Sequence, residues 1–425
     1  MKEEQTINGI PKNWKWVKLQ DIVSVLGDGL HGTPIYSEDG EYYFINGNNL
    51  SNDKIIIKEN TKRVCEEQFA KHKKNLTDKT ILVSINGTIG NVAFYKNEKV
   101  ILGKSACYFN VKDDINKYFI ALLLKTETFL RYANNSATGS TIKNVSLKAM
   151  REFEFPLPPL ELQTQIVSKI EELFSELDKG IEELKTAQQQ LKVYRQAVLK
   201  WAFEGKLTNE NVKDGELPEG WKWKTLGELC DPQRKCSYGV LVPGDHVENG
   251  VTLVRVGDID DNGRIDQSKL KKISPQIASK FKRTFLQGGE VLISLVGAIG
   301  RTAVVPVSLA GANTARAVGV IPISKDVSAK FVEAMLRSPD KIREHNNSSH
   351  EVARKTLNLE DVIKSNIPLP PIEEQQQIVQ EIESRLSVCD KIEETITDSL
   401  KQAEALRQSI LKKAFEGTLI NSDNL

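Results

Sequence analysis

The side chains in this chain best suited to chemistry are those that can read the edges of nucleic-acid bases. Arginine pairs with guanine, asparagine with adenine, and an acidic side chain with cytosine. Such residues stand beside strand-like runs in two separate stretches of the chain: Asn46, Asn48, Arg255, Asp258, Arg301, Asn313 and Arg316. Each could equally be an ordinary surface residue, because the sequence does not show which of them face a groove.

Two clusters of basic residues lie in the same two stretches. The first contains Lys71, Lys73 and Lys74, and the second contains Lys271, Lys272, Lys282 and Arg283. Basic side chains neutralise DNA phosphates, although a solvated lysine face looks the same in sequence. The two clusters occupy equivalent places in a repeated chain, and this favours phosphate contact.

The distribution of charge agrees with contact to an anion. The whole chain carries only +1, but residues 1–156 and 209–368 are each mildly positive, whereas the remaining stretches are negative. A positive surface attracts nucleic acid. No stretch approaches the roughly 18 apolar residues of a membrane span, and the first residues contain no apolar signal segment. Five scattered cysteines suit free thiols, so we expect a cytoplasmic protein.

No motif for catalysis stands out. The chain lacks a phosphate-binding Gly-x-x-x-x-Gly-Lys-Ser/Thr, a glycine-rich cofactor turn and a His-Glu-x-x-His metal motif. Pro339–Asp340 could begin a nuclease motif, but it has no counterpart elsewhere in the chain and is interpreted as a helix cap or loop. We therefore expect no catalytic residues, no metal site and no cofactor bound by this chain.

The sequence contains an internal duplication, and the candidate residues lie in its two halves. Residues 157–208 align without a gap with residues 369–420, and nearly half of the aligned positions are identical. Weaker matches precede each copy, such as Trp14 with Trp221. The chain therefore divides into two globular parts that differ in most residues, 1–156 and 209–368, and two near-identical parts, 157–208 and 369–425.

The near-identical parts are expected to be long helices. Leu-Pro-Pro opens each one and ends the preceding element, and no further proline follows within either helix. Apolar residues recur every seven positions, which is typical of a coiled coil. The expected seam is Ile170, Leu177, Leu184, Leu191, Val198, Ile382, Cys389, Ile396, Ala403 and Ile410. Companion positions three residues later include Tyr194, Ile392 and Leu406. Antiparallel pairing is favoured, although the sequence also permits parallel pairing.

The globular parts are expected to mix strands and helices. Tyr42–Ile45, Ile81–Ile85 and Val291–Ser294 have the pattern of strands, and Tyr118–Arg131 and Lys330–Arg337 that of helices. The predicted fold class is α+β: two similar globular domains alternate with two long helices that pair as an antiparallel coiled coil, in a tandem repeat with pseudo-two-fold symmetry.

The whole pattern resembles the specificity subunits of type I restriction-modification systems. The resemblance rests on the paired motifs Leu-Pro-Pro-[Leu/Ile]-Glu-x-Gln and Ala-Phe-Glu-Gly-x-Leu that open and close each helical copy. The segment Asp28–Pro34 also resembles the start of a target-recognition domain, which adds His31 and Thr33 to the candidate DNA contacts. The second globular part departs from this segment, so the two domains should read different half-sites.

The resemblance implies the remaining assignments. Residues 1–156 and 209–368 would be target-recognition domains, each reading half of a bipartite double-stranded DNA target, and 157–208 and 369–425 would be helical spacers. Two modification (methyltransferase) subunits and the restriction (translocase/endonuclease) subunits would be partners. S-adenosyl-methionine, ATP and Mg would belong to those partners, and this chain would be non-catalytic. A coiled-coil adaptor that binds only protein, or a methyltransferase or nuclease with unrecognised motifs, are the alternatives.

Overall fold

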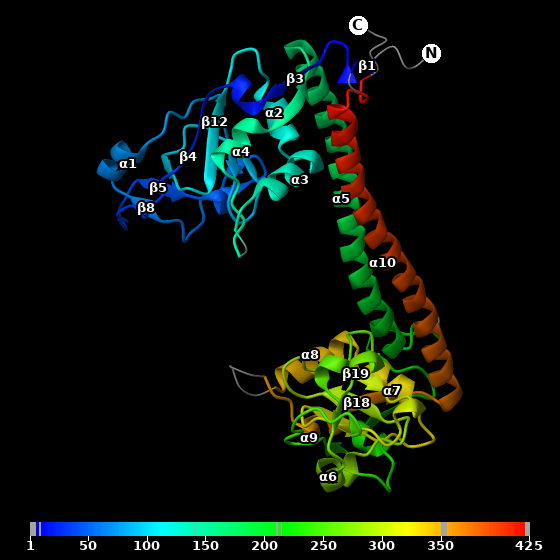
Figure 1. The fold of residues 1–425 in the computed structure, drawn as a ribbon. Coiled ribbons are helices and arrows are strands. Elements are labelled where there is room, and N and C mark those ends of the chain that lie inside the picture. The colour runs from blue at the N-terminus through cyan, green and yellow to red at the C-terminus, as the bar shows by residue number, and fades with distance from the viewer. Residues whose placement is uncertain are drawn as a thin grey trace. The chain divides into compact units, whose positions relative to one another are not determined.

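The computed structural model describes residues 6–7, 10–139, 141–209, 211–213, 215–349 and 355–420. The chain forms two compact units (Figure 1): unit 1 comprises the described residues of Met1–Leu184 and Asp398–Leu425, and unit 2 those of Lys185–Thr397. Each unit therefore contains one globular domain and a portion of both long helices. Among the described residues, no helix is both long and apolar enough to cross a membrane.

Two sheets form the globular domain of unit 1. The larger is antiparallel in the order β10-β9-β12-β4, from β4 (Val23–Asp28), β9 (Thr80–Ser84), β10 (Val92–Phe94) and β12 (Ala106–Val111). The smaller has the order β11-β5-β8, from β5 (Tyr42–Ile45), β8 (Arg63–Val64) and β11 (Val100–Leu102), with β11 parallel to β5. Three two-stranded ribbons pair β1 (Thr6–Ile7) with β2 (Ile10–Pro11), β3 (Lys15–Lys18) with β13 (Glu154–Leu157), and β6 (Leu50–Ser51) with β7 (Lys54–Ile55).

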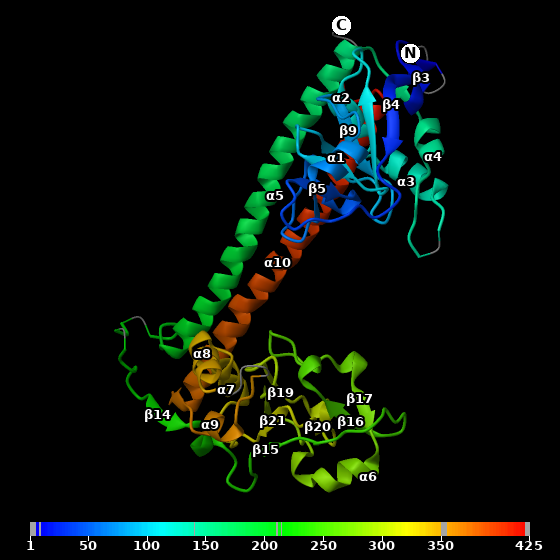
Figure 2. The same cartoon turned by 90° about the vertical axis from the view of Figure 1, so that its left-hand side faces the viewer.

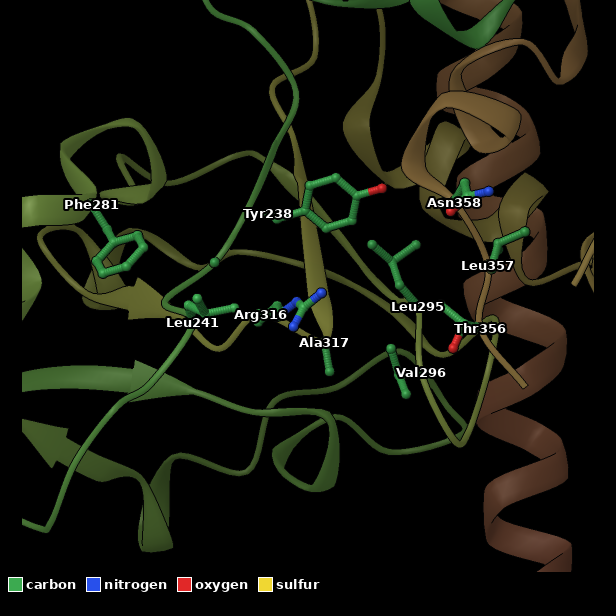
Figure 3. Close-up of a pocket in the computed structure, with 11 residues that line it drawn as sticks. Tyr238, Leu241, Phe281, Leu295, Val296, Arg316, Ala317, Thr356, Leu357 and Asn358 are labelled. Carbon is green, nitrogen blue, oxygen red and sulfur yellow. The ribbon is translucent and has the colours of Figure 1, made fainter. Parts of the chain in front are cut away.

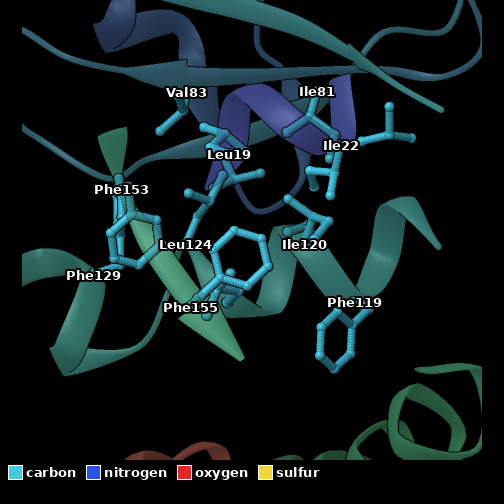
Figure 4. Close-up of a cluster of buried hydrophobic side chains, with 14 of the residues drawn as sticks. Leu19, Ile22, Ile81, Val83, Phe119, Ile120, Leu124, Phe129, Phe153 and Phe155 are labelled. Carbon is cyan, nitrogen blue, oxygen red and sulfur yellow. The ribbon is translucent and has the colours of Figure 1, made fainter. Parts of the chain in front are cut away.

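The central strand β9 is buried on both faces because successive side chains alternate between two hydrophobic clusters. Ile81 and Val83 join the cluster that the helices cover, and Leu82 joins the cluster beneath the smaller sheet. Figure 4 shows the helix-covered cluster, where Phe119, Ile120 and Leu124 lie with residues of the sheet. Burial on both faces explains why β9 has no polar alternation in its sequence.

Four short helices complete unit 1: α1 (Glu66–His72), α2 (Lys117–Leu123), α3 (Glu127–Ser136) and α4 (Leu147–Glu152). The single helix predicted over Tyr118–Arg131 is wrong, because the chain breaks into α2 and α3. The break is stabilised by Thr126, whose hydroxyl accepts a hydrogen bond from Phe129 N–H at 3.2 Å and starts α3.

Unit 2 repeats the topology of unit 1 (Figure 2). Its larger sheet has the order β15-β21-β18-β19 and its smaller sheet the order β17-β16-β20, with β20 parallel to β16. The strands are β15 (Ser237–Tyr238), β16 (Val251–Val254), β17 (Lys271–Ile273), β18 (Val291–Ser294), β19 (Thr302–Val304), β20 (Asn313–Thr314) and β21 (Val318–Ile321), and a ribbon pairs β14 (Lys222–Thr225) with β22 (Asn366–Leu369). The predicted α+β tandem repeat is confirmed.

The helices of unit 2 are also short. They are α6 (Pro275–Ala278), α7 (Ala329–Leu336), α8 (Pro339–Asn347) and α9 (Leu359–Ile363). Pro339 and Asp340 are the first residues of α8, directly after its N-cap residue Ser338, whereas their sequence is interpreted as a helix cap or loop. Short 3-10 turns in the two units cover Leu19–Ile22, Gly47–Asn49, Leu226–Leu229, Val256–Asp258, Gln267–Lys269, Ser279–Thr284 and Val307–Leu309.

The two long helices are α5 (Leu160–Phe203) and α10 (Ile372–Phe415), each of 44 residues. In unit 1 the start of α5 shares a core with the end of α10, through Ile170 and Ile410. In unit 2 the end of α5 shares a core with the start of α10, through Val198 and Ile382. The pairing within each unit is therefore antiparallel, as predicted.

The Leu-Pro-Pro…Gln motif has a physical explanation. Gln163 is buried at the start of α5; its side-chain amide donates to Pro158 C=O at 2.9 Å and accepts from Asn116 N–H, at the start of α2, at 2.8 Å. Gln375 makes the same two bonds, to Pro370 and from Ser328 at the start of α7. Each glutamine thus fastens a long helix to its globular domain.

The Ala-Phe-Glu-Gly motif likewise ends each long helix, in this case against a nearby proline. Gly205 and Gly417 have φ of +76° and +74°, values that favour glycine. A Cβ on Gly205 would lie 2.2 Å from Pro218 Cγ, and one on Gly417 would lie 2.4 Å from Pro11 Cγ. The two helix ends are therefore built in the same way.

Candidate nucleic-acid interfaces

The turn after β5 carries Asn46 and Asn48. Asn46 N–H donates to Asn49 Oδ1 at 3.0 Å, and Asn46 Oδ1 accepts from the Ser105 hydroxyl at 3.0 Å, so this side chain is half-buried and holds the turn. Asn48 is exposed, and Lys58 Nζ donates to its carbonyl at 2.9 Å. Asn48 therefore presents an amide that is accessible to a base edge.

The equivalent turn of unit 2, after β16, carries Arg255 and Asp258. Asp258 is buried, and its carboxylate accepts from Arg255 N–H at 2.7 Å and from the Arg255 guanidinium at 2.8 and 3.1 Å. These hydrogen bonds raise the pKa of Arg255. Asp258 thus cannot reach a base, because both carboxylate oxygens are occupied inside the turn; the Arg255 guanidinium is partly exposed.

Two other candidate DNA contacts of unit 2, Arg301 and Asn313, form hydrogen bonds within their own domain. Arg301 Nε donates to Asp261 Oδ1 at 2.7 Å, and its guanidinium also reaches Ile259 C=O at 3.3 Å. Asn313 is fully buried on β20, where Oδ1 accepts from Thr314 N–H at 2.8 Å and from the Thr284 hydroxyl. The prediction of a DNA contact at Asn313 is corrected, since its polar atoms satisfy the core.

The loop after β4 presents His31 and Thr33, both exposed. His31 Nε2 lies 2.6 Å from Asp28 Oδ2, which fixes the orientation of a ring that is 70% exposed. Farther along, Ile35 N–H donates to the buried Gln68 side chain at 3.3 Å and ties the loop to α1. The loop therefore holds the His31 ring in a fixed orientation, exposed to solvent.

Some residues of the basic clusters are held by hydrogen bonds to the backbone, and the others point into solvent without an ion pair among the described residues. Lys271 Nζ donates to Gly244 C=O at 2.6 Å and Lys272 Nζ to Glu248 C=O at 3.2 Å, so these two lysines hold the loop between β15 and β16. The others are exposed and form no ion pair within the described part of the chain: Lys71, Lys73, Lys74, Lys282 and Arg283. They lie in or after the helical segments that follow β8 and β17, and are available to phosphates.

A cavity in unit 2 has a volume of about 1040 Å³ and lies where the segment after β15 passes the start of β21 (Figure 3). Tyr238, Leu241 and Phe281 line it with Arg316. Leu241 is 54% exposed, an unusual position for leucine. The Arg316 side chain is exposed and has no ion pair or hydrogen bond to the described residues.

Sequence reasoning missed the counterpart of Arg316 in unit 1, which is Lys104. Lys104 is exposed and its ammonium is likewise unpaired within the described residues. It stands alone between Gly103 and Ser105, so a search for clusters overlooks it. The offset that aligns the two long helices also aligns Lys104 with Arg316, and would have found it.

The long helices bury one stripe and expose another. Ile382, Cys389, Ile396, Ala403 and Ile410 are all buried on α10; on α5, Ile170, Leu191 and Val198 are buried, and Leu177 and Leu184 are half-buried. Three of the companion positions behave differently from the expected seam, whereas Leu173 packs against the core of unit 1. Tyr194, Ile392 and Leu406 are exposed by 39%, 44% and 51%. The helices therefore carry apolar surface that their own pairing leaves uncovered.

Each of the two domains has the same topology and carries exposed cations and polar side chains on its loops, and both are joined to antiparallel helices. This is the architecture expected of a two-domain DNA-recognition subunit. The chain belongs to the type I restriction modification DNA specificity domain family, whose model matches residues 11–186 and 218–402. It is a specificity subunit of this family.

Known proteins resemble the chain over most of its length. The type I restriction enzyme EcoBI specificity subunit of Escherichia coli is 36% identical over 352 residues, which cover 80% of this chain and 73% of that protein. A chain in a solved type I restriction-modification system matches with a TM-score of 0.74 at 20% identity, covering 96% of this chain and 99% of its own. The HsdS subunit from Thermoanaerobacter tengcongensis matches with a TM-score of 0.58 at 20% identity, covering 96% and 98%. The two structures support the fold.

Proposed function

We propose that this chain directs a type I restriction-modification complex to a bipartite double-stranded DNA target and catalyses no reaction itself. Each globular domain reads one half-site. The observation that carries the proposal is a contrast between equivalent loop positions: Asp28 and His31 of unit 1 correspond to Tyr238 and Leu241 of unit 2 on the same backbone. Equal scaffolds with different side chains suit readers of different sequences.

Two modification subunits would bind surfaces that both repeats share. Trp16 on β3 and Trp223 on β14 are equivalent, and are 48% and 59% exposed. Tyr194 on α5 and Leu406 on α10 are a second equivalent exposed pair. Large exposed apolar side chains typically mark protein interfaces, and their repetition suits two copies of one partner.

The chemistry would belong to those partners. Modification subunits would carry S-adenosyl-methionine, and restriction subunits would use ATP and Mg for translocation and cleavage. The sequence of this chain contains none of the motifs that such chemistry requires, which supports a non-catalytic role. A complex that methylates the chromosome works in the cytoplasm, and we place the chain there.

Adenine-methylation mapping tests the proposal. The chain is produced with its modification subunit in a methylation-free host, and genomic DNA is sequenced for methyl-adenine. We expect one split motif methylated on both strands. A stable complex without methylation would contradict the proposal and favour a protein-binding adaptor, whereas methylation or cleavage by the purified chain alone would show it to be an enzyme.

A further inference from the structure

In unit 1 the segment after β4 crosses the turn between β11 and β12. Leu30 N–H donates to Leu102 C=O at 2.7 Å, and Lys104 N–H donates back to Leu30 C=O at 3.0 Å. Gly29 makes the crossing possible, because a Cβ there would lie 2.1 Å from Leu102 O. Gly103 N–H also donates to Ile45 C=O at 2.8 Å, so the backbone on which Lys104 stands is fixed from two sides.

Unit 2 builds the same crossing from different residues. Val240 N–H donates to Thr314 C=O at 2.7 Å, and Arg316 N–H donates back to Val240 C=O at 2.8 Å. A Cβ on Gly239 would lie 2.2 Å from Thr314 O, and Ala315 N–H donates to Val254 C=O at 2.9 Å. Both domains therefore contain the same backbone crossing, and each has a basic residue at the equivalent position, Lys104 or Arg316.

Lys104 and Arg316 differ from many other basic residues because no carboxylate pairs with them within the described residues. In the part of the chain that the structure describes, several other arginines in the globular domain of unit 2 are paired with carboxylates, although Arg283 is not: Arg234 pairs with Glu290, Arg255 with Asp258 and Arg301 with Asp261. In Figure 3 Arg316 lies beside Leu241 and Tyr238 in the open cavity. The residues flanking the cation differ between the units, whereas its charge and its backbone do not.

We propose that Lys104 and Arg316 are equivalent phosphate anchors, each of which binds a backbone phosphate of the half-site that its domain reads. This inference rests on the proposed function. Two domains that read different bases have only the sugar-phosphate backbone of DNA in common, so a shared cation suits the shared group. The fixed crossing then sets the register in which the differing neighbours meet the bases.

The test uses the complex of the full chain with its modification subunits. Two labelled duplexes, one with the methylated motif mapped for the parent complex and one scrambled, are titrated at several salt concentrations. We expect Lys104→Ala and Arg316→Ala each to weaken binding to both duplexes about tenfold. Each should lower the slope of log K against log salt by about 0.9, and the double variant by about twice that. The methylated motif should stay unchanged.

Matched controls exist at another equivalent pair. Arg131 on α3 and Arg343 on α8 are exposed surface arginines of the two units, each paired only within its own helix. Arg131→Ala and Arg343→Ala should leave affinity and salt slope unchanged, and Lys104→Arg and Arg316→Lys should keep most of the parent affinity. Thermal unfolding of each variant confirms that the fold is kept.

Three results would overturn the anchors. If the methylated motif changed in one half-site, Lys104 or Arg316 would be a base reader. If the slope of log K against log salt did not change, neither residue would contact a phosphate. If the arginine control variants lost as much affinity, the loss would be a general effect of charge. If the parent complex binds no DNA, the proposed function fails, and the phosphate anchors fail with it. If the parent complex binds its motif specifically but the variants behave like it, only the phosphate anchors fail.

Discussion

Arg195 on α5 donates to Asp390 on α10 at 2.8 Å, and Arg407 makes the equivalent pair with Asp178 in the other unit. Arg195 also reaches Glu393 at 3.0 Å. The pair thus recurs at the two places where the duplicated helices pack against each other. Burial alone would raise the pKa of Asp390, but hydrogen bonds from Arg195 and Arg264 lower it overall.

Removing this cross-helix pair should loosen the coiled coil. We expect Arg195→Ala to cost about 1 kcal/mol of unfolding free energy, a modest value because Asp390 is about one-third exposed and partly screened. The depressed pKa contributes stability above the unfolded-state pKa of Asp390, and this stability is lost as pH falls through the folded-state value. Denaturant unfolding at neutral and acid pH measures both. Lys169→Ala, which removes a pair with Glu172 inside α5, is the control and should cost less.

The glutamines at the helix starts should contribute more. Gln163→Ala removes two hydrogen bonds of a buried side chain and leaves Asn116 N–H and Pro158 C=O without a partner. We expect a loss of about 1–3 kcal/mol, with faster amide exchange at the start of α2. The exposed Gln189 on the same helix provides the control. Equal losses for both variants would contradict the fastening role.

The architecture could be predicted from the sequence because two strong signals recur. The heptad spacing of Ile382, Cys389 and Ile396 follows from helix geometry alone, and the repeat shows that one topology occurs twice. Local breaks were harder to predict. Apolar residues stand on both sides of Thr126, at Leu124 and Phe129, so the pattern suggested a single helix, whereas Thr126 caps a separate helix.

The candidate site was less predictable, because residue type does not determine exposure. Asp258 and Asn313 have the chemistry of base readers, yet the fold uses them in a turn and a core. Tyr194 and Leu406 follow the heptad, yet 39% and 51% of their surface is exposed. Exposure depends on tertiary contacts between distant segments, and the sequence pattern along one element does not contain them.

His345 on α8 should make unit 2 sensitive to acid. The residue is buried, neither ring nitrogen has a hydrogen-bond partner in the described part of the chain, and burial lowers its pKa to about 4. The unfolded chain therefore binds a proton first, near pH 6.5. Stability should be full above that pH and fall by up to about 3 kcal/mol as pH drops toward 4. His345→Leu should flatten this dependence in chemical denaturation, and an unchanged curve would count against it.

The loop after β4 should determine one half-site. The His31 ring is held outward by Asp28, and a well-oriented base contact discriminates by about 1–3 kcal/mol. We expect His31→Ala to relax one half of the methylated motif and leave the other half intact. Leu241→Ala, at the equivalent position of unit 2, should change only the opposite half. Methylation mapping of both variants checks this, and a change in both halves for either variant would refute separate reading.

The length of the helices should set the distance between half-sites. Seven residues added at equivalent points of α5 and α10 keep the buried seam in register and lengthen each helix by about 10 Å. At 3.4 Å per base pair, the methylated motif should gain about three base pairs of spacer with both half-sites unchanged. Three base pairs turn the duplex by roughly a third of a turn, whereas a heptad turns a helix by only about 20°, so methylation should also become less complete. An insertion into α5 alone is the control: it shifts Leu191 and Val198 against α10 and should abolish methylation. A lengthened helix pair that kept the parent spacer, or altered a half-site, would show that the helices do not measure the target.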